Sequence, residues 1–204
     1  IAKLQRDHGA DIERLPPDRK DGYRQVAMTA RDPQSRPFGQ LQSVEGRSVG
    51  RRWDHHLFVD DEGWFHYDFA SSWEIAVLEA AMAADGFLGW FRNEDRKDWA
   101  LTVPFRAGGE ARPMYPDLLV FRRQGAKAVA DLLDPHDHRR DDWLPKVQGL
   151  ADYAAKHWTA FGRMEAILLE RGVIHRLDLT IERNRRAAQR AEGPQTLRDL
   201  FTPD

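Results

Sequence analysis

Residues 114 to 134 hold two nearly continuous apolar runs, MYPDLLVF and AKAVADLLD, which are separated by Arg-Arg-Gln-Gly. Runs of this length on either side of a glycine turn predict two neighbouring antiparallel strands. Each run also carries aspartate where a buried strand favours Val or Leu. A buried carboxylate without a partner is costly, so each must meet either a basic side chain or a metal ion.

The register of this hairpin decides which acids meet. Gln124 and Gly125 are predicted as its two-residue loop, because glycine readily adopts a positive φ. That loop places Asp117 opposite Leu132, and alternation puts Asp117 on the same face as Asp134, with Asp131 on the other face. A loop longer by one residue would exchange the two, so Asp134 is preferred and Asp131 stays open as the second acid.

A third carboxylate lies on a predicted helix over residues 72–84. At about 100° per residue, Glu74 falls near the middle of the apolar face. A glutamate there is either paired with an arginine such as Arg92 or Arg96, or it belongs to a site with the other acids. Carboxylates that converge repel one another unless a cation lies between them. Oxygen ligands held on rigid elements suit Mg²⁺, so we expect a Mg²⁺ site.

The rest of the pattern predicts an α/β fold with a central mixed β-sheet flanked by helices. Residues 1–50, rich in Pro, Gly and charge, are expected to be a lead-in or linker, and residues 51–204 the domain. Within that domain we expect an aromatic hairpin around Asp-Asp-Glu-Gly, a helix that begins near Asp141 or Asp142, a strand pair around Arg171-Gly172 and a basic helical tail.

Composition narrows the function only a little. The 204 residues include no cysteine and have a formal net charge of −2, so thiolate zinc sites and a global attraction to nucleic acid are excluded. No apolar run approaches the length of a membrane span, and we expect a cytoplasmic protein without membrane contact. The first residue is Ile, which indicates a piece of a longer chain.

Two basic groups follow the acids. Lys146 lies at the flank of the apolar stripe of its helix, where its amine can reach a scissile phosphate and stabilise developing charge. His136 comes just after the second strand and is expected to contact the site or a phosphate. His136 and His138 together also suggest a transition-metal site, although the longer HxHxDH pattern of zinc hydrolases is absent.

These residues resemble the PD-(D/E)XK nuclease core. More specifically, GWFRN, MYPDLLVFR and DLLDPHDHRRDDWLPKVQGLADYAAKH resemble the C-terminal nuclease-like domain of type III restriction-type DEAD/DEAH helicases. The resemblance covers residues 53–180. It implies a restriction-endonuclease-like core that cleaves DNA with Mg²⁺ or Mn²⁺, joined to a helicase/ATPase region of the same parent chain and acting in restriction or phage defence.

The resemblance also implies roles for particular residues. Asp117 is the acid of the "PD" pair, Glu74 is the helix acid, and Asp134 or Asp131 is the second strand acid. The expected lysine is missing, since Asp134-Pro135-His136 stands at its place, and Lys146 from the following helix would replace it. Domains of this kind also occur as inactive modules that bind DNA or a partner, which is the alternative function.

Two basic patches are candidates for phosphate contact. The first lines one face of the C-terminal helix and the second flanks the hairpin turn; they comprise Arg183, Arg186 and Arg190, and Arg122, Arg123 and Lys127. No recognition motif for particular bases is present, so DNA contact without strong sequence preference is expected.

Overall fold

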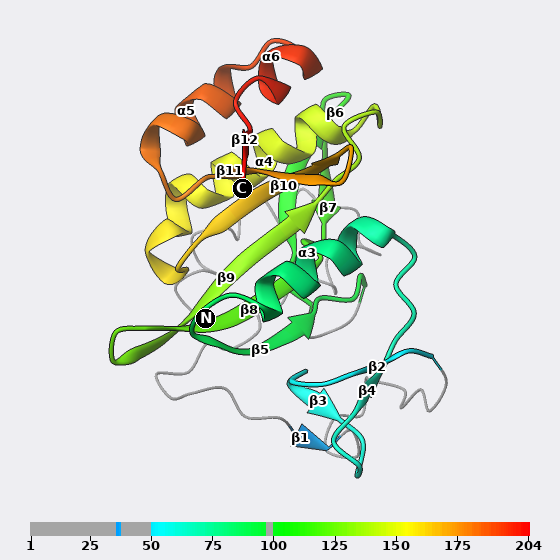
Figure 1. The fold of residues 1–204 in the computed structure, drawn as a ribbon. Helices are drawn as coiled ribbons and strands as arrows, with labels where there is room; N and C mark the ends of the chain where they lie inside the picture. Colours follow the sequence, from blue (N-terminus) through cyan, green and yellow to red (C-terminus); the bar gives the residue numbers. More distant parts are fainter. Residues whose placement is uncertain (1–35, 38–49, 97–99) are drawn as a thin grey trace.

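A computed structural model describes residues 36–37, 50–96 and 100–204. The predicted lead-in over residues 1–50 therefore falls almost wholly outside the described residues. The chain forms a mixed α/β fold with a six-stranded sheet between helices (Figure 1). This confirms the predicted mixed sheet flanked by helices.

The sheet has the order β12-β11-β10-β9-β8-β5. Its strands are β5 (Phe87–Arg92), β8 (Leu118–Gln124), β9 (Lys127–Pro135), β10 (Met164–Glu170), β11 (Val173–Asp178) and β12 (Thr202–Pro203). Within this six-stranded sheet only β9 and β10 pair in parallel, and helix α4 (Trp143–His157) connects them. A parallel pair needs such a crossover, which explains why a helix follows the second acidic strand.

Two separate cores cover the two faces of this sheet. Helix α3 (Ser72–Met82) buries Val77, Leu78 and Ala81 against one face, together with Leu118 and Leu133. Helix α4 belongs to the other core, with helix α5 (Glu182–Arg190) and helix α6 (Pro194–Arg198) beyond it (Figure 1). Ser71 caps α3, because its Oγ accepts a hydrogen bond from the N–H of Trp73 at 3.1 Å.

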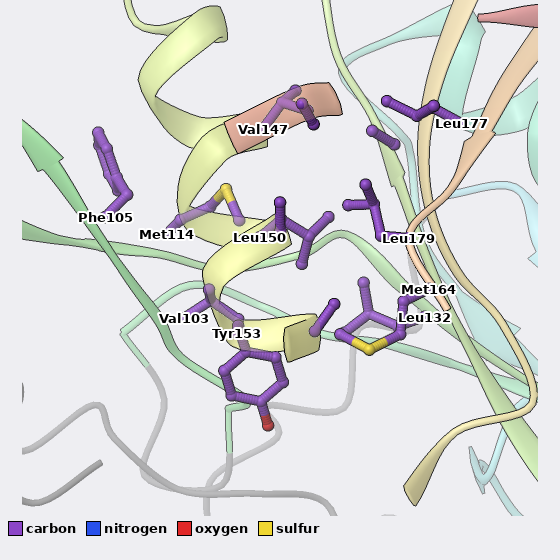
Figure 2. Close-up of a cluster of buried hydrophobic side chains, with 14 of the residues drawn as sticks. Val103, Phe105, Met114, Leu132, Val147, Leu150, Tyr153, Met164, Leu177 and Leu179 are labelled. Atoms are coloured by element: carbon purple, nitrogen blue, oxygen red, sulfur yellow. The ribbon is translucent and has the colours of Figure 1, made fainter. Parts of the chain in front are cut away.

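A hairpin that the sequence did not reveal packs on the outside of α4. Strands β6 (Val103–Ala107) and β7 (Glu110–Met114) form a two-stranded sheet of their own. Figure 2 shows α4 between this hairpin and the main sheet. Gly149 permits the close approach: a Cβ at that position would lie 2.4 Å from the Cβ of Phe105.

The hairpin between β8 and β9 corrects the predicted register. Gln124 pairs with Lys127, so the two-residue loop is Gly125-Ala126 rather than Gln124-Gly125. Gly125 has a φ of +60°, which fits glycine at the first central position. All pairs shift by two residues, which preserves the faces and brings Asp117 opposite Asp134 instead of Leu132.

The aromatic hairpin predicted around Asp-Asp-Glu-Gly is only partly right. The chain does turn back there, since the N–H of Asp60 bonds the carbonyl of Trp64 at 2.8 Å. However, strand β3 (Phe58–Val59) pairs with β1 (Arg36–Pro37), while β4 (Phe65–His66) pairs with β2 (Arg52–Trp53). The two halves of the expected hairpin therefore pair with different strands.

Candidate metal centre

The candidate site lies where β8 begins and β9 ends. Asp117 immediately precedes β8, Asp134 is the penultimate residue of β9, and His136 follows that strand. One ligand atom from each of these residues lies within 4.8 Å of the others. Alternation along β9 supports the preference for Asp134, and the structure therefore brings together two of the predicted acids and the predicted histidine.

Burial makes this arrangement electrostatically costly. Asp134 is 2% exposed. Its pKa rises to about 6, mainly because of burial, with a further increase from Asp117 and opposing effects of His136 and Lys146. Its Oδ1, and Nε2 of His136, are buried and have no hydrogen-bond partner. Unpaired buried donors and acceptors of this kind are rare, and here they adjoin a cluster of metal-ligand types.

Glu74 reaches the same region from the first turn of α3. Its pKa is raised to about 7, mainly by burial and also by the charges of Asp117 and Asp134, while the charge of Arg92 acts in the opposite direction. The Nη2 of Arg92 lies 3.2 Å from Oε2 of Glu74. The group of atoms close enough to share one ion contains His136 and does not contain Glu74.

Arg92 forms ion pairs with two of the acids, Glu74 and Asp117. Its Nη1 donates to Oδ1 of Asp117 at 2.7 Å and to the carbonyl of Asp117 at 2.9 Å, and its side chain is 12% exposed. The arginine pairing considered for Glu74 is thus present, and the same guanidinium also serves Asp117. Within the described residues, Asp134 forms no ion pair with an arginine. Its ion-pair partner there is His136, whose Nδ1 lies 3.3 Å from Oδ2 of Asp134.

Asp131 has a different environment. It is fully buried, and its Oδ2 accepts hydrogen bonds from Nε of Arg122 at 2.6 Å and Nε of Arg163 at 2.8 Å. Asp131 lies three residues before Asp134, so it points to the opposite face of β9. It is a salt-bridged structural acid, and Asp131 does not belong to the group with Asp117, Asp134 and His136.

Lys146 lies in the first turn of α4, and its charge lowers the pKa of Asp134. Its Nζ is 2.7 Å from Oδ2 of Asp142, and its side chain is 17% exposed. Asp142 is the N-cap residue but makes no capping hydrogen bond, because its carboxylate faces the lysine instead. Lys146 is therefore close enough to Asp134 to lower the pKa of that carboxyl, but its amine is ion-paired with Asp142.

The predicted basic patches are only partly free for phosphate. On α5, Arg183, Arg186 and Arg190 are exposed, although Arg186 pairs with Glu182. The neighbouring Arg185 is buried, and it donates to the carbonyls of Leu179 and Thr180.

At the hairpin turn, Lys127 and Arg123 are exposed, while Arg122 is used by Asp131. This turn lies at the far end of β8 and β9 from Asp117, roughly 20 Å along the strands. It is therefore badly placed to hold a phosphate over the acids.

His138 does not join the metal-ligand group. Its Nε2 lies 4.0 Å from Oε1 of Glu170, which also receives a 2.6 Å contact from Nε of Arg198. A zinc site built from His136 and His138 together is therefore not assembled in the described residues.

The fold and site define a mixed α/β protein with a cluster of two carboxylates and one imidazole at one end of its sheet, of which Asp134 is buried and the other two are half-buried. The chain belongs to the YagJ family, whose model matches residues 54–204. It is 31% identical over 201 residues to Protein YagJ of Escherichia coli strain K12, and the match covers 94% of this chain and 82% of that protein. No solved structure matches. The described residues contain no helix that is both long and apolar enough for a membrane crossing.

Proposed function

We propose that this chain is a divalent-cation-dependent DNA endonuclease domain with a PD-(D/E)XK-type core. The observation that supports this most strongly is the convergence of Asp117, Asp134 and His136 within 4.8 Å, with orphaned buried atoms on two of them. The order of elements also supports it. Helix α3 with Glu74 is followed in the main sheet by β5, by β8 directly after Asp117 and by β9 with Asp134, and then by α4 with Lys146.

The residues present fit a divalent cation, since carboxylate oxygens and imidazole nitrogen are its usual protein ligands. Asp117 and Asp134 would hold it. A bound divalent cation activates water and polarises the scissile phosphate. Glu74, which has a pKa of about 7, is suited to accept the proton of the attacking water near neutral pH. Lys146, whose charge acts on Asp134, would stabilise the charge that develops on phosphate.

The proposal keeps the predicted biological setting, but the comparison with Protein YagJ gives the helicase region less support than the other parts. The helicase/ATPase region, the restriction or phage-defence role and the cytoplasmic location follow from resemblance and composition, and they stay predictions. Less than a fifth of Protein YagJ lies outside its match to this chain, which leaves little room in that relative for a helicase.

Plasmid cleavage tests the proposal. Wild-type protein, Asp117→Ala and the control Asp137→Asn are incubated with supercoiled DNA in Mg²⁺, in Mn²⁺ and in EDTA. Asp137 lies in the same loop as His136 and pairs with Arg139 at the surface, so its variant should cut normally. Cleavage that needs the metal and disappears in Asp117→Ala is expected. Equal cleavage by wild-type protein and Asp117→Ala contradicts the proposal.

A second candidate is a non-catalytic nuclease-like module that binds DNA or a partner protein. The observation in its favour is Arg92, which already neutralises Glu74 and Asp117, together with the missing lysine at position 136. This candidate predicts salt-sensitive DNA binding and no cleavage with any divalent cation. It also predicts that Asp134→Asn leaves DNA binding unchanged.

A further inference from the structure

We propose that His136 supplies a nitrogen ligand to the cation site, and that the site therefore selects a first-row transition-metal dication such as Mn²⁺ over Mg²⁺. This inference rests on the cation site of the proposed function and specifies its metal. It assigns to His136 a role that the resemblance does not supply, because the nuclease motif has lysine at this position.

The position of His136 is the first observation. It follows β9 directly, and a ligand atom of its ring lies within 4.8 Å of ligand atoms of both Asp117 and Asp134. The backbone fixes this placement, since the N–H of His136 bonds the carbonyl of Ile167 on β10 at 2.9 Å. The ring is thus carried by the same rigid strand pair that carries Asp134.

The hydrogen bonding of the ring is the second observation. The Nδ1 of His136 lies 3.1 Å from the carbonyl of Pro135 and 3.3 Å from Oδ2 of Asp134. Both neighbours are acceptors, so the proton of a neutral ring belongs on Nδ1. That tautomer leaves the lone pair on Nε2, the buried atom that has no partner. A carboxylate or carbonyl on one ring nitrogen is the usual support for a metal on the other.

The remaining donors explain the choice of ion. Arg92 holds Glu74 and Asp117 through the contacts described above, which reduces the oxygen donors that are free for a hard cation. Mg²⁺ is bound almost entirely by oxygen and gains little from imidazole, whereas transition-metal dications bind imidazole well. Replacing an oxygen ligand by His136 therefore weakens the site for Mg²⁺ more than for Mn²⁺.

His138 provides a matched control. It lies two residues further along the same loop, has a half-buried ring and faces Glu170 rather than Asp134. The variant His138→Asn should leave the metal site intact, while His136→Asn exchanges the nitrogen donor for an amide oxygen of similar size. The pair separates loss of the ligand from general disturbance of the loop.

The experiment uses tag-free protein, so that no other histidine-rich segment binds the probe. Mn²⁺ and Mg²⁺ are titrated separately by calorimetry, and the Mn²⁺ complex is examined by pulsed EPR for coupling to ¹⁴N. Wild type and His138→Asn should bind Mn²⁺ roughly tenfold or more tightly than Mg²⁺ and show the nitrogen coupling. His136→Asn should lose the coupling and most of the preference.

Absence of nitrogen coupling in wild-type protein, or its persistence in His136→Asn, overturns the inference. The wild-type measurements decide the matter even where the variant fails to fold. The proposed function fails separately: Mn²⁺ binding with nitrogen coupling but no DNA cleavage supports the inference and removes the nuclease. Cleavage with Mg²⁺ and no nitrogen coupling does the reverse.

Discussion

Two buried aspartates on β9 should respond to the same substitution with opposite sign. Asp131 and Asp134 are three residues apart and are 0% and 2% exposed. Asp131 accepts hydrogen bonds from two arginines, whereas Asp134 lies close to the carboxylate of Asp117 and 3.3 Å from Nδ1 of His136. Replacing each by asparagine removes a charge and changes little else. We expect Asp134→Asn to stabilise the metal-free protein and Asp131→Asn to destabilise it.

The magnitude for Asp134 follows from its pKa. The folded-state pKa is raised from 3.8 to about 6. The charged form therefore destabilises the fold by about 3 kcal/mol above pH 6, and the penalty fades as pH falls from about 6 to 3.8. Loss of the contact with His136 offsets about 1 kcal/mol. The net gain is about 2 kcal/mol at pH 8, roughly 4–8 °C in Tm.

Asp131→Asn leaves Arg122 and Arg163 without their carboxylate. Removing one partner of a buried ion pair costs about 3 kcal/mol, roughly 6–12 °C in Tm. Thermal unfolding followed by circular dichroism in EDTA at pH 8 and pH 4 measures both variants. Adding Mn²⁺ should raise the Tm of wild type and Asp131→Asn but not of Asp134→Asn. If Asp134→Asn is destabilised at pH 8 as strongly as Asp131→Asn, the reasoning is refuted.

Three other changes have definite expected outcomes. Arg92→Met leaves Glu74 and Asp117 without their shared guanidinium, so the free energy of unfolding in EDTA should fall by about 3 kcal/mol. Mn²⁺ should restore part of this loss. Equal Tm values for wild type and variant in EDTA would contradict the expectation. Burial lowers the pKa of His56 to about 3. Because the folded pKa lies below the unfolded value of 6.5, wild type should lose about 1.4 kcal/mol per pH unit below 6.5 relative to His56→Gln, measured by urea unfolding from pH 7 to pH 4.5. Gly149→Ala should lower the free energy of unfolding by about 1–3 kcal/mol because it overpacks the α4–β6 contact, although alanine favours helix. An unchanged Tm would contradict this and show that the contact can relax.

Local patterns predicted much of what positions the site. The helix with Glu74 on its apolar face, the β8–β9 hairpin and the preference for Asp134 over Asp131 all follow from periodicities of 3.6 and 2 residues. The misplaced turn did not alter the face of either acid, because a two-residue shift preserves alternation. Those parts of the prediction depended only on neighbours along the chain.

Interactions between distant segments were beyond such reasoning. Arg163, which follows Asp131 by 32 positions, could not be named as its partner from any local pattern. The β6–β7 hairpin was missed because its strands are short and β7 contains proline and charged residues. The third member of the metal-ligand group was expected to be Glu74, but the pairing of Glu74 with Arg92 was weighed only as an alternative, and the structure contains it.

The β6–β7 hairpin also connects Asp117 with helix α4. Its last residue, Met114, is buried in the core with α4, and the chain reaches Asp117 after only two intervening residues. The same helix carries Lys146. Asn93 holds the end of this short connection, because its Nδ2 donates to the carbonyl of Pro116 at 2.8 Å and its N–H donates to the carbonyl of Asp117 at 3.0 Å. The position of Asp117 is therefore set from both sides, by the buried hairpin that precedes it and by the residue that follows β5.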